Sequence, residues 1–139
     1  MFDDRARESA HRLAKNGGGS IVNIASVSAL IGNVGRAAYG ASKAALVNLS
    51  QTMASELASA KVRVNCVCPG PIATPLSLKV HTDQVKDMWH QAVPLMRYGT
   101  PDEVANLIGF LMDETLSSYI TGQTISVDGG FIASGLRRG

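Results

Sequence analysis

Three short runs of apolar, mostly β-branched residues divide the chain and predict its strands. The first two, residues 20–25 and 62–67, are nearly continuous in apolar positions. That pattern is typical of parallel strands covered on both faces. The third run, residues 124–128, ends at a pair of glycines. We therefore predict three strands, the first two of them buried.

Apolar residues at helical spacing separate these strands. Residues 2–16 carry such a pattern and run into three glycines, which predicts a helix with a glycine stop. Residues 38–60 are rich in Ala, Ser and Leu and contain no proline, which predicts a long helix. Residues 26–36 show no sustained period and predict a loop.

A capping box opens a third helix. Thr100 supplies the N-cap, Pro101 stands at the first helical position and Glu103 at the third. Apolar residues then continue the helical spacing to Met112. In contrast, residues 74–98 show no clean period, so we expect an irregular or short-helical excursion there.

The order strand, long helix, strand determines the fold class. A crossover of this length between two doubly buried strands makes a right-handed parallel βαβ unit, so the chain is predicted to be α/β. With 139 residues and no repeat or linker, the chain holds one domain at most.

Charge and hydropathy exclude several classes of protein. The net charge is +2, and the only basic cluster is the terminal pair Arg137 and Arg138. We therefore expect no nucleic-acid-binding face. The longest apolar run falls far short of the ~20 residues that a bilayer requires, and residues 1–15 are charged with no signal-peptide core. A cytoplasmic protein that does not bind membranes is expected.

The sequence contains no pattern of metal ligands. Cys66 and Cys68 lie two apart in a predicted strand, where both point to one face but are poorly placed for a disulfide. No His or Cys pair has zinc spacing. We expect no metal site, and reduced, inert cysteines.

Candidate chemistry gathers where two predicted strands end. Tyr39 and Lys43 are four apart near the start of the long helix, so their side chains share one face. A lysine ammonium near a phenol favours the phenolate, which makes the pair a usable general acid/base. Ser26 directly follows the first strand, and Gly70 lies in the proline-rich loop after the second. Both loops lie at the carboxyl end of the sheet, where open parallel sheets bind ligands.

Taken in order, the motifs strongly resemble the short-chain dehydrogenase/reductase family. They are Gly-Gly-Gly-Ser-Ile-Val-Asn-Ile-Ala-Ser (17–26), Tyr-Gly-Ala-Ser-Lys (39–43), Val-Arg-Val-Asn-Cys-Val-Cys-Pro-Gly-Pro-Ile-Ala-Thr (62–74), Tyr-Ile-Thr-Gly-Gln (119–123) and Val-Asp-Gly-Gly (127–130). The resemblance covers nearly the whole chain, from Phe2 to Phe131.

The resemblance implies an oxidoreductase that uses NAD or NADP to interconvert an alcohol and a carbonyl. It implies that Tyr39 exchanges the proton with the substrate, that Ser26 steadies the substrate oxygen, and that Lys43 favours the phenolate and binds the nicotinamide ribose. It also implies a cofactor-binding role for the segment after the second strand. The residues concerned there are Pro69, Gly70, Ile72 and Thr74.

Other polar residues are expected to be structural. His81 and His90 are interpreted as surface residues, Asn23 and Asn65 as residues that tie loops by hydrogen bonds, and Asp128 as part of a turn. The expected pocket wall comes from residues 74–98 with Ser28 and Ile31. Its apolar candidates, which indicate an apolar substrate moiety, are Leu76, Leu78, Met88 and Trp89.

The sequence departs from the family at the phosphate-binding turn. No Gly-x-Gly-x-x-Gly occurs, and the resemblance implies that the first half of a doubly wound, Rossmann-type sheet is missing, together with the residue that selects NAD or NADP. Strand 20–25 would then be an exposed edge, and association into a homodimer or homotetramer is expected. Three readings follow: a catalytic half that needs the missing half, a truncated non-catalytic module that oligomerises or binds a partner, and a self-sufficient enzyme.

Overall fold

One three-stranded parallel sheet organises the molecule, whose computed structural model describes residues 3–134. Its strands lie in the order β1 (Gly19–Ile24), β2 (Val62–Pro69) and β3 (Thr124–Val127). In this register Gly19 lies opposite Val62, and Cys66 lies opposite Thr124. The predicted α/β class and the three parallel strands are confirmed, with each boundary within two residues of its expected place.

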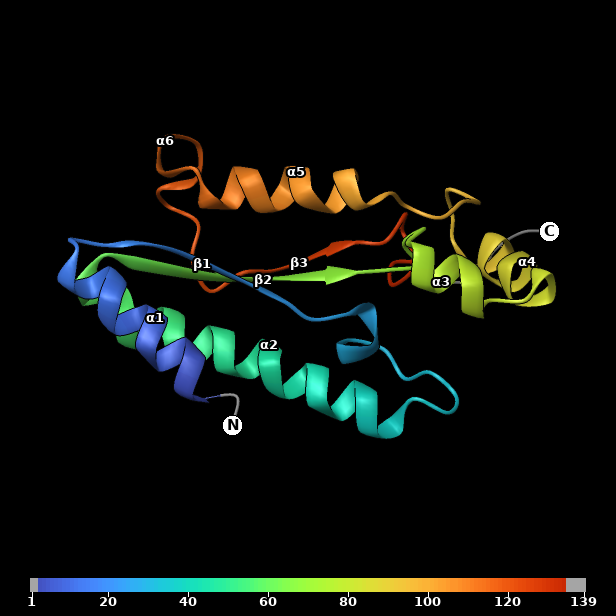
Figure 1. The fold of residues 1–139 in the computed structure, drawn as a ribbon, viewed down its shortest axis with the longest axis horizontal. Helices are drawn as coiled ribbons and strands as arrows, with labels where there is room; N and C mark the ends of the chain where they lie inside the picture. The colour runs from blue at the N-terminus through green and yellow to red at the C-terminus, as the bar shows by residue number, and fades with distance from the viewer. Residues whose placement is uncertain (1–2, 135–139) are drawn as a thin grey trace.

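Helices cover both faces of the sheet. One face carries α1 (Asp3–Lys15) and α2 (Ala37–Leu57), and the other carries α5 (Pro101–Met112) with the short α6 (Glu114–Ser117), as Figure 1 shows. Because the central strand is covered from both sides, its continuous apolar pattern matches its surroundings.

The core lies on both faces of β2, with two clusters on the α2 side and one on the α5 side. Val62 and Val64 point toward α2, where they pack against Met53. On the opposite face Val67 packs with Leu111 of α5, and both side chains are fully buried. This alternation along a single strand fastens α2 and α5 to the same sheet.

Two short helices lie beyond the carboxyl ends of the strands. They are α3 (Pro75–Val80) and α4 (Asp83–Ala92), and all three strands point toward them (Figure 1). Each begins at a threonine cap, with Thr74 Oγ1 accepting from Ser77 N and Thr82 Oγ1 from Val85 N. The short-helical alternative for residues 74–98 is therefore the correct one. A threonine caps each helix, and in α4 the apolar residues Val85, Met88 and Trp89 stand at helical spacing on one face.

The capping box of α5 is confirmed. Thr100 Oγ1 accepts from the backbone N–H of Glu103, and the Glu103 carboxylate accepts from Thr100 N at 2.8 Å. Differences from the expected elements are confined to short pieces. The 3₁₀ turn η2 (Ala58–Ala60) extends α2, the 3₁₀ turn η1 (Val27–Ala29) lies in the expected loop, and α6 was not expected.

Three residues used in the sequence predictions cannot be compared. Phe2, the expected start of the first helix, and the basic pair Arg137 and Arg138 lie outside the described residues.

Candidate active site

A pocket of about 570 Å³ opens at the carboxyl ends of β1 and β2. Its wall is built from the loop after β1, the start of α2, the loop after β2, α3 and α4, and the segment after β3. The lining residues are Ser26, Val27, Ser28, Asn33, Val34, Arg36, Tyr39, Gly70, Pro71, Ile72, Thr74, Ser77, His81, Val85, Met88, Trp89, Ala92 and Phe131. Five of the seven predicted site residues are among them, the exceptions being Lys43 and Pro69.

Ser26 lies where β1 gives way to η1. Its Oγ accepts the backbone N–H of Ser28 at 3.2 Å and so caps that turn. A hydroxyl has one donor as well as acceptor positions, so this contact leaves the Ser26 O–H available. Ser26 can therefore donate a hydrogen bond to an oxygen in the pocket.

Tyr39 and Lys43 lie one turn apart on α2, on the same side of the helix. The Lys43 Nζ lies 5.8 Å from the centroid of the Tyr39 ring and donates to the carbonyl oxygen of Ile24 at 3.2 Å. The end of β1 thus anchors the ammonium beside the phenol. Tyr39 itself faces the pocket, so a proton on its hydroxyl is accessible to a ligand.

Position 70 requires a glycine for a packing reason that the sequence alone does not reveal. A Cβ at this position would lie 2.8 Å from the Cα of Asp128, and the Gly70 N–H donates to Val127 O at 2.9 Å. Gly70 is therefore required for close approach of the segment after β3. Pro69 is the last residue of β2 and pairs with Val127.

The loop after β2 presents an open backbone donor. Ile72 forms a parallel bridge with Gly99 in which the bonds run from Ala73 N to Gly99 O and from Gly99 N to Pro71 O, both 2.9 Å. In such a bridge the N–H of Ile72 points away from Gly99, and it has no hydrogen-bond partner within residues 3–134. The carbonyl oxygen of a carboxamide is an acceptor that fits such an N–H donor at a pocket wall.

The Thr74 hydroxyl is already engaged. It accepts from Ser77 N and donates to Ser77 Oγ, both at 3.1 Å, and that Oγ in turn donates to Ile72 O at 2.7 Å. Thr74 therefore holds the start of α3 against the pocket, a role that the sequence reading missed.

The far wall of the pocket is apolar. Met88 and Trp89 line it as expected, and the Trp89 ring meets Phe131 edge-on with centroids 5.2 Å apart. Leu76 and Leu78 were expected there but are 70% and 51% exposed and do not line it. Ile31 lines a neighbouring cavity, together with Ser28.

The interpretation of His81 as a surface residue is wrong. His81 is half-buried and lines the pocket, and its Nδ1 lies 2.9 Å from the Tyr98 hydroxyl. Burial of the Tyr98 side chain raises the pKa of its hydroxyl. His90 is exposed and meets the Tyr98 ring edge-on. Sequence separation hid this cluster, because Tyr98 follows α4 whereas His81 precedes it.

Arg36 is a second lining residue that sequence reasoning missed. It stands at the N-cap of α2, and its guanidinium carbon lies 5.6 Å from the Tyr39 ring centroid. Its position three residues before Tyr39 was the available signal.

The amides and Asp128 have structural roles. Asn65 is fully buried and ties the segment before β3, since it donates to Ile120 O and accepts from Gln123 N. Asp128 accepts from the N–H groups of Gly130 and Ile132, which confirms the expected turn. Asn23 donates to Ser50 Oγ, so it ties β1 to α2 and not to a loop as expected.

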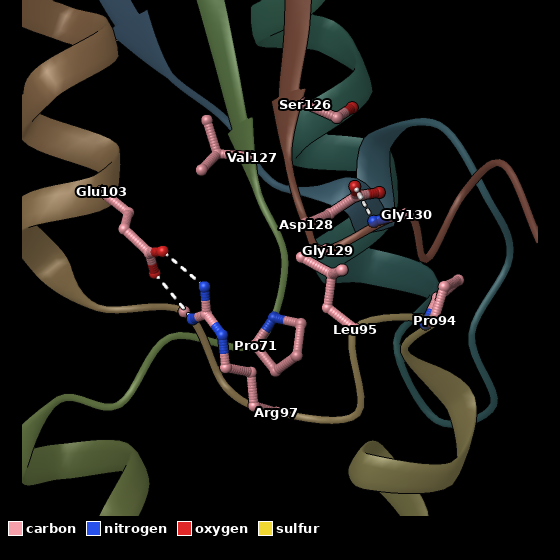
Figure 2. Close-up of a pocket in the computed structure, with 11 residues that line it drawn as sticks. Pro71, Pro94, Leu95, Arg97, Glu103, Ser126, Val127, Asp128, Gly129 and Gly130 are labelled. Carbon is pink, nitrogen blue, oxygen red and sulfur yellow. Dashed lines mark hydrogen bonds and ion pairs between the residues drawn. The ribbon is translucent and has the colours of Figure 1, made fainter.

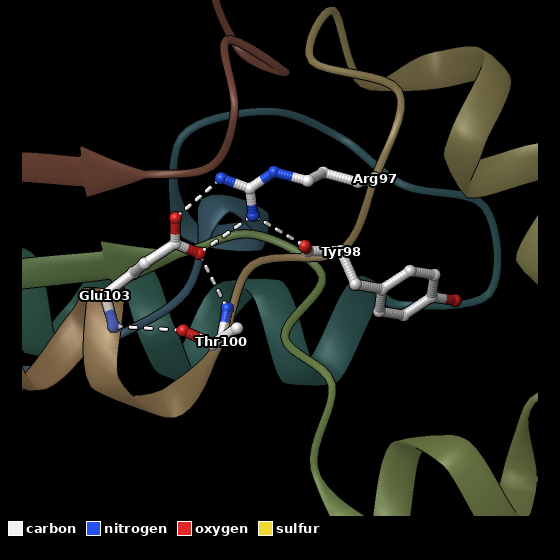
Figure 3. A network of polar contacts seen from close by, with 4 residues as sticks. All are labelled: Arg97, Tyr98, Thr100 and Glu103. Atoms are coloured by element: carbon white, nitrogen blue, oxygen red, sulfur yellow. Dashed lines mark hydrogen bonds and ion pairs between the residues drawn. The ribbon is translucent and has the colours of Figure 1, made fainter.

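A second pocket, of about 520 Å³, lies beside the first at Pro71 (Figure 2). Its Arg97 makes a two-pronged ion pair with Glu103, at 2.9 and 2.6 Å, and also donates to Tyr98 O (Figure 3). Hydrogen bonds from Arg97 lower the pKa of Glu103 to about 2. These charges hold the capping box of α5, so we assign this pair a structural role.

Cys66 and Cys68 are free and fully buried on one face of β2, against Leu46 of α2. Their mutual hydrogen bond lowers the pKa of Cys66 and raises that of Cys68. Elsewhere in residues 3–134, no group of three or more His, Cys, Asp or Glu side chains could hold a metal ion. Within the same residues no helix is both long and apolar enough to cross a membrane.

Comparison with known sequences gives consistent matches. A family model described as enoyl-(acyl carrier protein) reductase matches residues 5–132. A 3-oxoacyl-[acyl-carrier-protein] reductase of Synechocystis sp. is 44% identical over 120 residues, which is 86% of this chain and 47% of the relative. A (3R)-3-hydroxyacyl-CoA dehydrogenase of Mus musculus is 43% identical over 122 residues, 87% and 46% of the two chains. The chain spans about half the length of the curated relatives it matches.

Solved structures agree on the fold. A 7α-hydroxysteroid dehydrogenase in complex with NADH and 7-oxo glycochenodeoxycholic acid superposes with a TM-score of 0.85 at 35% identity, over 90% of this chain and 49% of that one. A gluconate 5-dehydrogenase from Burkholderia cenocepacia J2315, in complex with NADP and tartrate, gives 0.88 at 30% identity, over 94% and 51%.

Proposed function

The chain belongs to the short-chain dehydrogenase/reductase family, and from this premise we propose that it carries the catalytic part of a nicotinamide-dependent oxidoreductase that interconverts an alcohol and a carbonyl. The observation that carries the proposal is the convergence of Ser26 and Tyr39 on one pocket, with the Lys43 ammonium anchored beside the phenol. Ser26 follows β1, whereas Tyr39 and Lys43 lie on α2. Together they supply a hydrogen-bond donor, an acid/base and a fixed positive charge.

The pocket suits the nicotinamide end of the cofactor. The unpartnered N–H of Ile72 would bind the carboxamide, and Lys43 with Tyr39 would hold the ribose. Pro69 and Gly70 would shape the backbone there, and Thr74 would contribute through the turn that it caps. When bound, NAD or NADP supplies or accepts the hydride.

The phosphate end of the cofactor needs a different element. No Gly-x-Gly-x-x-Gly turn occurs in the 139 residues, and backbone amides of such a turn normally receive the pyrophosphate. We infer that these residues form one partial Rossmann-type domain, which corresponds to the substrate-binding and catalytic part of the relatives.

The shared pocket of Ser26 and Tyr39, with Lys43 beside the phenol, supports the following proton transfer. In reduction, Ser26 donates a hydrogen bond to the substrate carbonyl oxygen and fixes it near the Tyr39 hydroxyl. Tyr39 then gives its proton to that oxygen, and the adjacent Lys43 charge stabilises the phenolate left behind. In oxidation, the same phenolate takes the proton from the alcohol.

The test joins this chain to the part of the Synechocystis sp. reductase that the match does not cover, and follows NADPH and NADH oxidation with ethyl 3-oxobutanoate. Tyr39→Phe should lower kcat/KM by roughly 10²-fold or more because the proton donor is lost. The dissociation constant of the cofactor, measured by calorimetry, should change little.

Tyr119→Phe is the matched control. Tyr119 is fully exposed on the turn after α6, so this variant should keep full activity. Retention of more than about a tenth of the activity by Tyr39→Phe would remove Tyr39 from the mechanism. A joined protein that binds NADPH but never turns over would instead support the non-catalytic reading.

Two further expectations belong to the same proposal. A homodimer or homotetramer would cover the unpaired edge of β1, where Ile24 is 49% exposed. We also place the protein in the cytoplasm, because the proposed chemistry depends on a nicotinamide pool.

A further inference from the structure

The charge of the candidate active-site pocket is one-sided. Its lining contains Arg36 and no Asp or Glu. Lys43 stands just behind the wall, beside the Tyr39 ring. A pocket with cationic groups and no carboxylate favours an anionic ligand.

Arg36 is the cation best placed to bind an anion. No carboxylate of the described residues forms an ion pair with it. The guanidinium carbon of Arg36 lies 5.6 Å from the centroid of the Tyr39 ring. Tyr39 is the residue to which we assign proton transfer. An anion bound by Arg36 would therefore lie within a few bonds of the carbonyl that Tyr39 serves.

The pocket wall formed by α4 and Phe131 carries no charged side chain. Val85, Met88, Trp89 and Phe131 form an apolar surface, with the two aromatic rings in edge-on contact. A ligand that spans the pocket would therefore place its apolar part there and its charged part toward the start of α2.

Resting on the function proposed above, we propose that the substrate is an oxo acid or the matching hydroxy acid, with its carboxylate on Arg36 and its apolar part against Trp89 and Phe131. A planar guanidinium binds a carboxylate through two parallel N–H donors, which would also orient the carbonyl toward Ser26 and Tyr39. The phosphate of an acyl carrier protein or coenzyme A thioester lies a whole pantetheine arm from the carbonyl, beyond the reach of this guanidinium.

Ligand binding to this pocket can be measured by the intrinsic fluorescence of the protein. Trp89 is its single tryptophan and lines the pocket, so its fluorescence follows occupancy in the 139-residue chain without turnover. The probes are 3-oxobutanoate and its uncharged methyl ester, with inorganic pyrophosphate as a test of an alternative anion. We expect the acid to bind about tenfold more tightly than the ester, the scale of a charge-assisted hydrogen bond.

Variants at Arg36 decide the assignment. Arg36→Gln should bring the affinities of acid and ester to about the same value, whereas Arg36→Lys should retain part of the preference because it keeps the charge but loses the fork. Arg12→Gln is the matched control, since Arg12 pairs with Glu8 on α1 and should leave the preference unchanged. Added salt should weaken the preference of the unmodified chain.

Several results would overturn the proposal. They are equal affinity for acid and ester, no binding of 3-oxobutanoate, a preference that survives in Arg36→Gln, or an Arg36 dependence confined to pyrophosphate, which would assign the cation to the cofactor. Failure of the Tyr39→Phe test in the joined enzyme would leave this binding preference intact. The two proposals therefore fail separately.

Discussion

At the scale of single residues, the same residue type has opposite consequences at two sites. Gly129 has φ +62°, and a Cβ there would lie 2.6 Å from Val93 Cγ1. Gly109 lies in the interior of α5 with nothing within 4 Å of the position that a Cβ would occupy. Gly129 is required because of its left-handed backbone and the nearby Val93 side chain. Gly109 lowers the stability of α5, and no close contact requires a glycine there.

We therefore predict opposite effects of one substitution. Gly129→Ala should lower the free energy of unfolding by about 2 kcal/mol, because it combines a left-handed backbone with a clash. Gly109→Ala should raise it by about 0.5–1 kcal/mol. Urea titrations followed by Trp89 fluorescence measure both, and equal shifts of the two midpoints would contradict the prediction.

At the scale of elements, local caps determine which helices form around the pocket. Thr74 and Thr82 start α3 and α4, and Thr100 with Glu103 starts α5. Arg97, from the loop before α5, reinforces this capping box, because its guanidinium forms an ion pair with the Glu103 carboxylate. This helix therefore depends on a carboxylate that must stay ionised.

The pH dependence of stability follows from that carboxylate. Its pKa is lowered to about 2 in the folded chain, from about 4.5, so its contribution is complete above the unfolded pKa and is lost as pH falls toward 2. The difference in Tm between the unmodified chain and Glu103→Gln should be largest above pH 5 and shrink toward zero near pH 2.

Thermal unfolding by circular dichroism between pH 2 and 7 measures this difference. Asp102→Asn is the control, because it removes the same charge one residue away, where no ion pair is present among the described residues. A Glu103→Gln difference that does not vary with pH would show that the ion pair contributes nothing.

At the scale of the whole molecule, the sheet has two open edges. Within residues 3–134, β1 and β3 each pair only with β2. An apolar edge strand presents free backbone groups to other chains, and β1 ends at the half-exposed Ile24. The 139-residue chain is therefore expected to associate with itself.

Sedimentation velocity over a range of concentrations tests this expectation. The chain should sediment above the 14.6 kDa monomer, and Ile24→Lys should shift it toward the monomer because a lysine blunts a strand edge. Val34→Lys adds the same charge to a fully exposed loop position and should change association less. A single monomeric species at all concentrations would rule out the open edge as an interface.

Agreement between sequence and structure is closest where the signal is local. The Thr100 box, the buried run of β2 and the one-turn spacing of Tyr39 and Lys43 depend on residues within a few positions of each other, and the structure reproduces all three. The order of the elements then placed Ser26 and Gly70 at one end of the sheet. The sequence by itself therefore determined the strands, the long helices, their order and the end of the sheet where the candidate site lies.

Only the tertiary structure decided what closes that site. Trp89 meets Phe131, His81 meets Tyr98, and Gly70 lies against Asp128, and each of these contacts joins segments separated along the chain. No local propensity encodes such contacts, because they depend on how α2, α5 and the sheet pack and on the space left between them. The positive charge of the pocket arises in the same way. Among the described residues, the fold brings no carboxylate into an ion pair with Arg36, and none lines the pocket.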